Sequence, residues 1–268
     1  VEALESETDD SEKLDFYKAV KISMKGMAEF GDRYAAEASK MASVETDPVR
    51  KQELLEIASI CARVPRFGAT SFYEAVQSMT LAHICIFMET FGETTCPGRI
   101  DQFLNPFYEK DVAAGNISRE RAKEILGAFC VKLCETIPMH GEVGTSTLGG
   151  LTSWEVVTIG GQDKDGNDAT NELSFVLLEL ADELRMRQPN FHVRIHKNTP
   201  KAFYDEVIRI NFGPGSAPAM YNDETIIESM TDIGYSLEDA RNYVAIGCVE
   251  PTAPGKTLAS TDAAMYNM

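Results

Sequence analysis

Trp154-Glu155-Val156-Val157-Thr158-Ile159, closed by Gly160-Gly161, has the length and the β-branched residues of a buried strand. It is the first of four such runs in the second half of the chain, and helical patterns separate them. The other predicted strands are 191–196, 219–221 and 243–246, and the predicted helices are 169–187, 200–212, 224–233 and 237–242. This alternation with short loops predicts an α/β fold, either a barrel or an open sheet.

The first half of the chain has helical patterns instead. Apolar residues recur with a period near 3.6 from Lys13 to about Ala42, and Asp47-Pro48 has the form of an N-cap followed by a first-turn proline. Further helices are predicted to Pro65, over 71–90, and from an N-cap at Ser118 to just before Pro138. We therefore expect a mainly helical segment over residues 1–140 and an α/β segment over 141–268.

Composition limits the classes of partner. The 268 residues include 42 acidic and 25 basic side chains, which gives a formal charge of −17. Such a surface repels phosphate backbones and anionic lipids, so neither nucleic acid nor a membrane is predicted as a partner. The six cysteines form no CxxC pair and the chain starts without a signal-peptide pattern, so we expect a reducing, cytoplasmic setting.

Two motifs have simple structural interpretations. Asp163–Asp168 carries acidic residues, but Gly166 is fourth rather than sixth, so a turn is favoured over a calcium loop. His192, Arg194 and His196 alternate along one predicted strand and should share one face. That face could line a pocket, but it is a poor metal triad because arginine does not bind metal.

Arg99 and Asp101 lie in Gly98-Arg99-Ile100-Asp101-Gln102, after a loop that contains Cys96. They could form a structural ion pair or border a substrate pocket, and spacing does not decide between the two.

Gly247-Cys248-Val249-Glu250-Pro251 follows the last predicted strand, where α/β proteins present reactive groups. A thiol with a nearby carboxylate but no histidine is not a usual ionic nucleophile pair. A core cysteine at a strand end is the competing interpretation.

Several segments resemble the glycyl radical enzymes, the pyruvate formate-lyase-like superfamily, in the same order along the chain. Gly247–Pro251 looks like the family's catalytic cysteine loop. The other matching segments are Ser71–Gln77, Gly98–Tyr108, Gly160–Ser174, Gln188–His196 and Ser260–Ala264. The resemblance covers nearly the whole chain.

The resemblance implies a ten-stranded barrel built as two half-barrels, surrounded by helices, with the cysteine loop at its centre. We expect this chain to hold the first half of that barrel and the helices before it, as an internal fragment that lacks the radical-bearing C-terminal segment. A fragment of this kind should be inactive by itself, and its unpaired sheet edges should make it poorly soluble.

The resemblance also implies a mechanism. No cofactor or metal is expected on this chain; a glycyl radical on the missing segment, installed by a radical-SAM activase, generates a thiyl radical on Cys248. That radical abstracts hydrogen from a small polar substrate, and Glu250 acts as general base to expel water or another leaving group. The further substrate contacts that we expect are Cys96, Ser153, Trp154 and Thr261.

Val249 stands where pyruvate formate-lyase-type members carry a second cysteine, which argues against acyl transfer. The Cys-x-Glu-Pro form fits dehydratases and C–N or C–S lyases, so an anaerobic radical lyase is the predicted function. The alternatives are an arylacetate-type decarboxylase of the same family and a non-catalytic α/β binding module. The expected partners are a small-molecule substrate, the radical-SAM activating enzyme and a second copy in a homodimer, in the cytoplasm or within a bacterial microcompartment.

Overall fold

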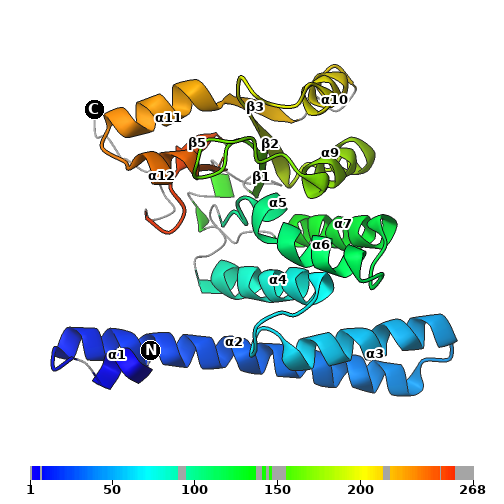
Figure 1. Cartoon of the computed structure of the whole chain (residues 1–268). Helices are drawn as coiled ribbons and strands as arrows, with labels where there is room; N and C mark the ends of the chain where they lie inside the picture. The colour runs from blue at the N-terminus through cyan, green and yellow to red at the C-terminus, as the bar shows by residue number, and fades with distance from the viewer. Residues whose placement is uncertain are drawn as a thin grey trace. The chain divides into compact units, whose positions relative to one another are not determined.

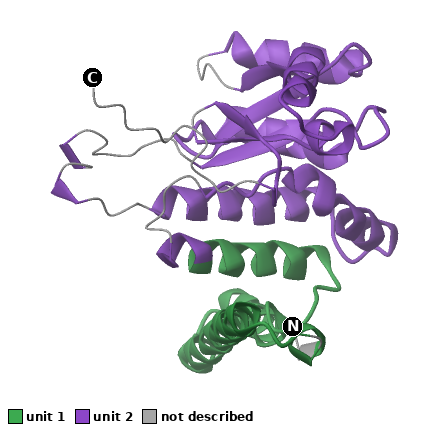
Figure 2. Cartoon of the chain, turned by 90° about the vertical axis from the view of Figure 1, so that its left-hand side faces the viewer, with its two compact units in different colours: residues 1–85 green, residues 86–268 purple. Residues whose placement is uncertain are grey.

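The structure is a computed structural model that describes residues 2–6, 8–89, 95–136, 141–142, 145–146, 155–213, 218–247 and 249–256. It divides into two compact units, residues 1–85 and residues 86–268 (Figure 2). The helices are α1 (Glu2–Ser6), α2 (Ser11–Val44), α3 (Pro48–Arg63), α4 (Phe72–Glu89), α5 (Ile100–Phe103), α6 (Asn105–Ala113), α7 (Arg119–Glu135), α9 (Glu172–Leu184), α10 (Lys201–Asn211), α11 (Asp223–Asp232) and α12 (Leu237–Arg241). The strands are β1 (Val156–Gly160), β2 (Asn190–Ile195), β3 (Ala219–Asn222), β4 (Val244–Ile246) and β5 (Glu250–Thr252).

The first unit is built on the antiparallel pair α2 and α3 (Figure 1). The carboxylate of Asp47 accepts the Val49 amide at 2.9 Å and begins α3 with proline in its first turn, as the sequence predicts. Gly31 lets the two helices approach closely, because a Cβ there would lie 2.8 Å from the Val64 carbonyl oxygen.

The second unit contains a parallel sheet in the order β1–β2–β3. The predicted strands and the helices between them are confirmed within a few residues, so the chain is mixed helix and sheet. Helices α9 and α10 lie on one side of this sheet (Figure 1), where Leu177 and Phe203 are fully buried. We call the other side the inner face; it carries Thr158, His192, Arg194 and Tyr221 by strand alternation.

Strand β4 lies against the inner face and pairs with β5 as an antiparallel hairpin. The backbone N–H of Ala245 in β4 donates to Thr158 Oγ1 in β1 at 3.1 Å. The hairpin therefore brings Glu250 and the two described residues of the cysteine loop (residues 247–249), Gly247 and Val249, to the inner face.

Arg194 fixes this arrangement from the centre of the inner face. Its guanidinium, which is fully buried, donates to both carboxylate oxygens of Asp223 at 2.8 and 2.9 Å, and to the carbonyl oxygens of Tyr243 and Arg241 at 2.9 and 2.8 Å. The Tyr243 hydroxyl donates to the same Asp223 carboxylate at 2.9 Å. Four hydrogen bonds thus tie β2 to the start of α11 and to the chain that enters β4, and a fifth joins these two to each other.

Four elements were not anticipated from the sequence: α1, α5, α6 and β5. Their segments are short, and β5 consists of Glu250, Pro251 and Thr252, a sequence without a strand signal in which the proline also argues against a strand. The stretch 81–88 of α4 is apolar nearly all round, a composition typical of a buried helix, yet Ile86 and Met88 are exposed. An apolar composition shows that a helix can be covered on all sides but does not show that it is.

Candidate functional site

The structure describes two of the six predicted site residues, Cys96 and Glu250. The other four, Cys248, Ser153, Trp154 and Thr261, lie outside the described residues. The structure therefore describes the surroundings of the cysteine loop.

Cys96 and Glu250 are brought together although they are far apart in sequence. Burial, together with the negative charges of Glu155 and Glu250, raises the pKa of the half-buried Cys96 thiol to about 12. Backbone hydrogen bonds at Val156 and Gly247 offset part of this effect. The thiol therefore lies between the start of β1 and the cysteine loop, in surroundings that disfavour a thiolate.

Glu250 begins β5 and is half-buried. Its Oε2 accepts the backbone N–H of Val249 at 3.0 Å, so the carboxylate folds back along the cysteine loop. Pairing of Glu250 with Ile246 sets where the loop begins and ends.

His192 is a residue of this site that sequence reasoning did not assign. It is 2% exposed on the inner face, and its ring stacks on Tyr221 with the centroids 4.9 Å apart. Burial lowers the pKa of His192 to about 4, against the opposing negative charge of Glu250. The alternation of His192 and Arg194 along one strand was the available signal, but periodicity alone does not say what a strand face meets.

An imidazole, that of His192, thus lies within electrostatic reach of Glu250, the carboxylate that follows the cysteine loop. An imidazole whose pKa is near 4 is nevertheless a weak base at neutral pH.

Arg99 and Asp101 both bind the end of β1 at Gly160. The Asp101 carboxylate accepts the Gly160 amide at 2.8 Å and the Ser174 hydroxyl at 2.7 Å, and Arg99 donates to the Gly160 carbonyl at 2.9 Å. Burial and the positive charge of Arg194 lower the pKa of Arg99 to about 10. The two side chains therefore position β1 and α9 under the site.

The acidic turn is structural. Asp163 accepts the backbone N–H groups of Asp165 and Asn167 at 2.9 and 2.8 Å, as expected of a turn rather than a calcium loop. Across the described ranges, no group of three or more potential ligands could hold a metal ion. In the same part of the chain, no helix is long and apolar enough to cross a membrane.

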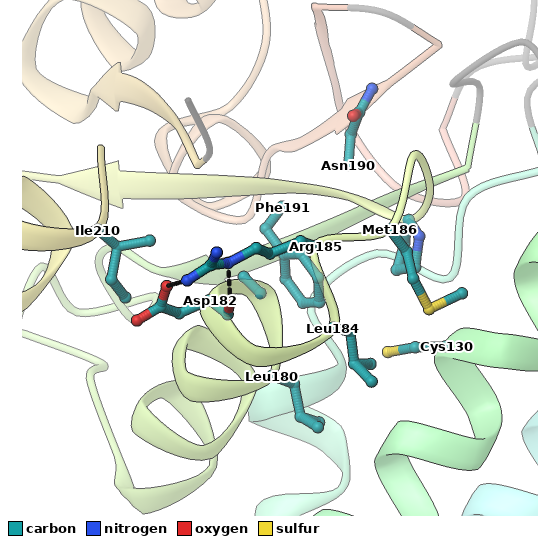
Figure 3. Close-up of a pocket in the computed structure, with 11 residues that line it drawn as sticks. Cys130, Leu180, Asp182, Leu184, Arg185, Met186, Asn190, Phe191 and Ile210 are labelled. Atoms are coloured by element: carbon teal, nitrogen blue, oxygen red, sulfur yellow. Dashed lines mark hydrogen bonds and ion pairs between the residues drawn. The ribbon is translucent and has the colours of Figure 1, made fainter. Parts of the chain in front are cut away.

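A small cavity of about 70 Å³ opens on the other side of β2 (Figure 3). Cys130, Leu180 and Phe191 contribute apolar lining, and Arg185 binds Asp182 at its edge. It is far below the roughly 300–1,000 Å³ of a typical ligand pocket, so we assign it to imperfect helix packing.

Comparison with known proteins identifies the family of the chain. The family model for pyruvate formate lyase-like proteins matches residues 1–268. The chain belongs to the pyruvate formate lyase-like family. The cysteine loop, β1 and β2 all lie within the matched region.

Relatives in this family include glycyl radical enzymes. The chain is 36% identical over 265 residues to trans-4-hydroxy-L-proline dehydratase of Clostridioides difficile, covering 96% of this chain and 34% of that protein. It is 36% identical over 265 residues to isethionate sulfite-lyase of Oleidesulfovibrio alaskensis, covering 98% of this chain and 32% of that protein. The crystal structure of a glycyl radical enzyme from Archaeoglobus fulgidus superposes with a TM-score of 0.88 at 37% identity, over 95% of this chain and 33% of that one.

The chain therefore spans about a third of the length of the curated relatives that it matches. Membership in the family holds for all of its 268 residues.

Proposed function

We propose that the protein containing this chain is a glycyl radical lyase that removes water or another leaving group from a small polar substrate. The observation that carries the proposal is that the chain holds the family's Cys-x-Glu-Pro loop, in which the Glu250 carboxylate accepts the Val249 amide at 3.0 Å and the neutral imidazole of His192 lies within its electrostatic reach. Support for the lyase class comes from the names of the dehydratase and the sulfite-lyase relatives.

In this family a glycyl radical, installed by a radical-SAM activating enzyme, supplies the hydrogen-atom abstraction that begins a turnover. We assign to Cys248 the thiyl radical that takes a hydrogen atom from a substrate carbon, forming S–H as C–H breaks. Glu250 then accepts the proton of the hydroxyl on that carbon, so that a carbonyl forms as the neighbouring carbon–heteroatom bond breaks. When the leaving group is hydroxide, Glu250 returns the proton to it as water.

The product radical takes the hydrogen atom back from Cys248, which balances the first step. The expected contacts from Cys96, Ser153, Trp154 and Thr261 would hold the substrate during these steps, and the half-barrel would exclude water from them. We extend the proposal to the ten-stranded barrel, of which β1–β4 would be the first strands, and to the homodimer, the cytoplasmic setting and the division near residue 140.

The test uses the longest reading frame that contains this chain, activated anaerobically. Candidate hydroxylated substrates are incubated with the wild type and with Glu250→Gln, and both the leaving group and carbon dioxide are quantified. The proposal predicts release of water, amine or sulfite without carbon dioxide, and a loss of about 10²–10⁴-fold in kcat for Glu250→Gln, the usual contribution of a general base. Carbon dioxide release would identify the decarboxylase alternative, and no turnover of any compound would favour the binding module.

A further inference from the structure

His192 is a buried imidazole that the described protein leaves incompletely satisfied. It is 2% exposed, and its Nδ1 has no hydrogen-bond partner among the residues that the structure describes. His196, two residues further along, has one: its Nε2 lies 3.0 Å from Asp168 Oδ1. Buried polar atoms normally have a partner, and leaving one unsatisfied costs about 1–3 kcal/mol.

Packing does not require this imidazole. The His192 ring stacks on Tyr221 at a centroid distance of 4.9 Å, a contact that a phenylalanine ring would also make. A phenylalanine would do so without burying an unsatisfied nitrogen. The histidine is therefore explained better by a partner that is not part of the described chain than by the core.

The charges of the site limit what that partner can be. The negative charges of Glu155 and Glu250 raise the pKa of Cys96, and the charge of Glu250 also raises the pKa of His192. Arg194 on the same face already donates four hydrogen bonds to protein oxygens. The inner face around His192 therefore suits an uncharged hydrogen-bonding group and repels a carboxylate or a sulfonate.

We propose that His192 is a specificity-determining residue whose imidazole hydrogen-bonds a substrate hydroxyl beside Glu250. The inference rests on the proposed function, since the hydroxyl belongs to the substrate of that reaction. Any anionic group of the substrate would then bind away from this part of the inner face. The neutral imidazole offers one donor and one acceptor nitrogen, so it can bind a hydroxyl in either sense.

The test compares variants matched in shape. His192→Asn keeps a polar group near the position of Nδ1, His192→Leu has nearly the same shape without one, and His192→Phe keeps the ring. Glycerol, trans-4-hydroxy-L-proline and isethionate are titrated calorimetrically into the non-activated full-length protein, and KM and kcat are measured after activation. His196→Asn is the control, because its partner lies within the protein.

We expect His192→Leu and His192→Phe to weaken binding of at least one probe, and to raise its KM, by about tenfold or more, while His192→Asn stays within about threefold of wild type. The melting temperature of His192→Phe should equal or exceed that of the wild type, a result that a structural role does not give. His196→Asn should lower the melting temperature without changing the Kd.

The inference is overturned if both apolar variants bind every probe within about twofold of the wild type, or if no probe binds. It is also overturned if His192→Asn loses as much affinity as His192→Leu, since a polar group would then be irrelevant. Should Cys248→Ser retain turnover, the proposed function fails instead, so the two failures are distinguishable.

Discussion

Gly161 is the position where a single methyl group should damage the site most. Its φ is +83°, and a Cβ would lie 2.5 Å from Nε and 2.7 Å from Cζ of Arg194. The guanidinium cannot move aside without breaking its hydrogen bonds of 2.8–2.9 Å to Asp223, Tyr243 and Arg241. Gly161→Ala therefore combines backbone strain with an overpacked, fully buried ion pair.

The magnitude follows from these two effects. An alanine in the left-handed region costs about 1–2 kcal/mol, and overpacking of a core adds about 1–3 kcal/mol. We therefore expect Gly161→Ala to lower the free energy of unfolding by about 2–5 kcal/mol. Gly115→Ala is the matched control, because Gly115 has a φ of +71° but no atom within 4 Å of its Cβ position. It should cost only the strain, about 1–2 kcal/mol.

Pulse proteolysis of the full-length protein in urea measures both variants against the wild type. The difference between the two variants isolates the collision with Arg194, and it should be about 1–3 kcal/mol. Equal destabilisation by Gly161→Ala and Gly115→Ala would refute the reasoning that Arg194 is fixed in place.

Three further predictions concern stability. The pKa of His192 is lowered to about 4 in the folded protein from an unfolded value near 6.5, so its contribution to the free energy of unfolding is present above pH 6.5 and is lost as the pH falls toward 4. Between about pH 7 and pH 5 the loss should be about 2 kcal/mol. It should be seen as a difference in urea midpoints that His192→Phe abolishes. Asp223→Asn leaves the buried Arg194 charge uncompensated and should lower the free energy of unfolding by about 3–5 kcal/mol, measured in the same way, and a loss below about 1 kcal/mol would mean that the pair is solvated. Gly31→Ala should lower the melting temperature by separating α2 from α3, because its Cβ would lie 2.8 Å from the Val64 carbonyl; an unchanged melting temperature would show that the helices can shift apart freely.

Local chemistry explains which elements were predictable. Asp47 with Pro48, Ser118, and the β-branched run of β1 each carry their signal within a few residues, and all three begin or form the expected element. The short segment β5 is a strand because it pairs with β4, and nothing in the sequence of β5 itself indicates that pairing.

The site was predictable only in part for a similar reason. Resemblance selects Glu250 and Cys96, and the structure brings both to the cysteine loop. His192 comes to Glu250 through the register of β2 against β3 and the position of the β4–β5 hairpin. That proximity is a property of the tertiary fold, so the spacing of the histidine along its own strand could not reveal it.

Cys248 carries the central claim, and one measurement tests it most directly. The full-length protein and its Cys248→Ser variant are activated anaerobically, the glycyl radical is quantified by electron paramagnetic resonance, and turnover of the best substrate is followed in the same samples. The account predicts that the variant accumulates the glycyl radical to the wild-type level but forms no product. Product formation by Cys248→Ser at the wild-type rate would contradict it.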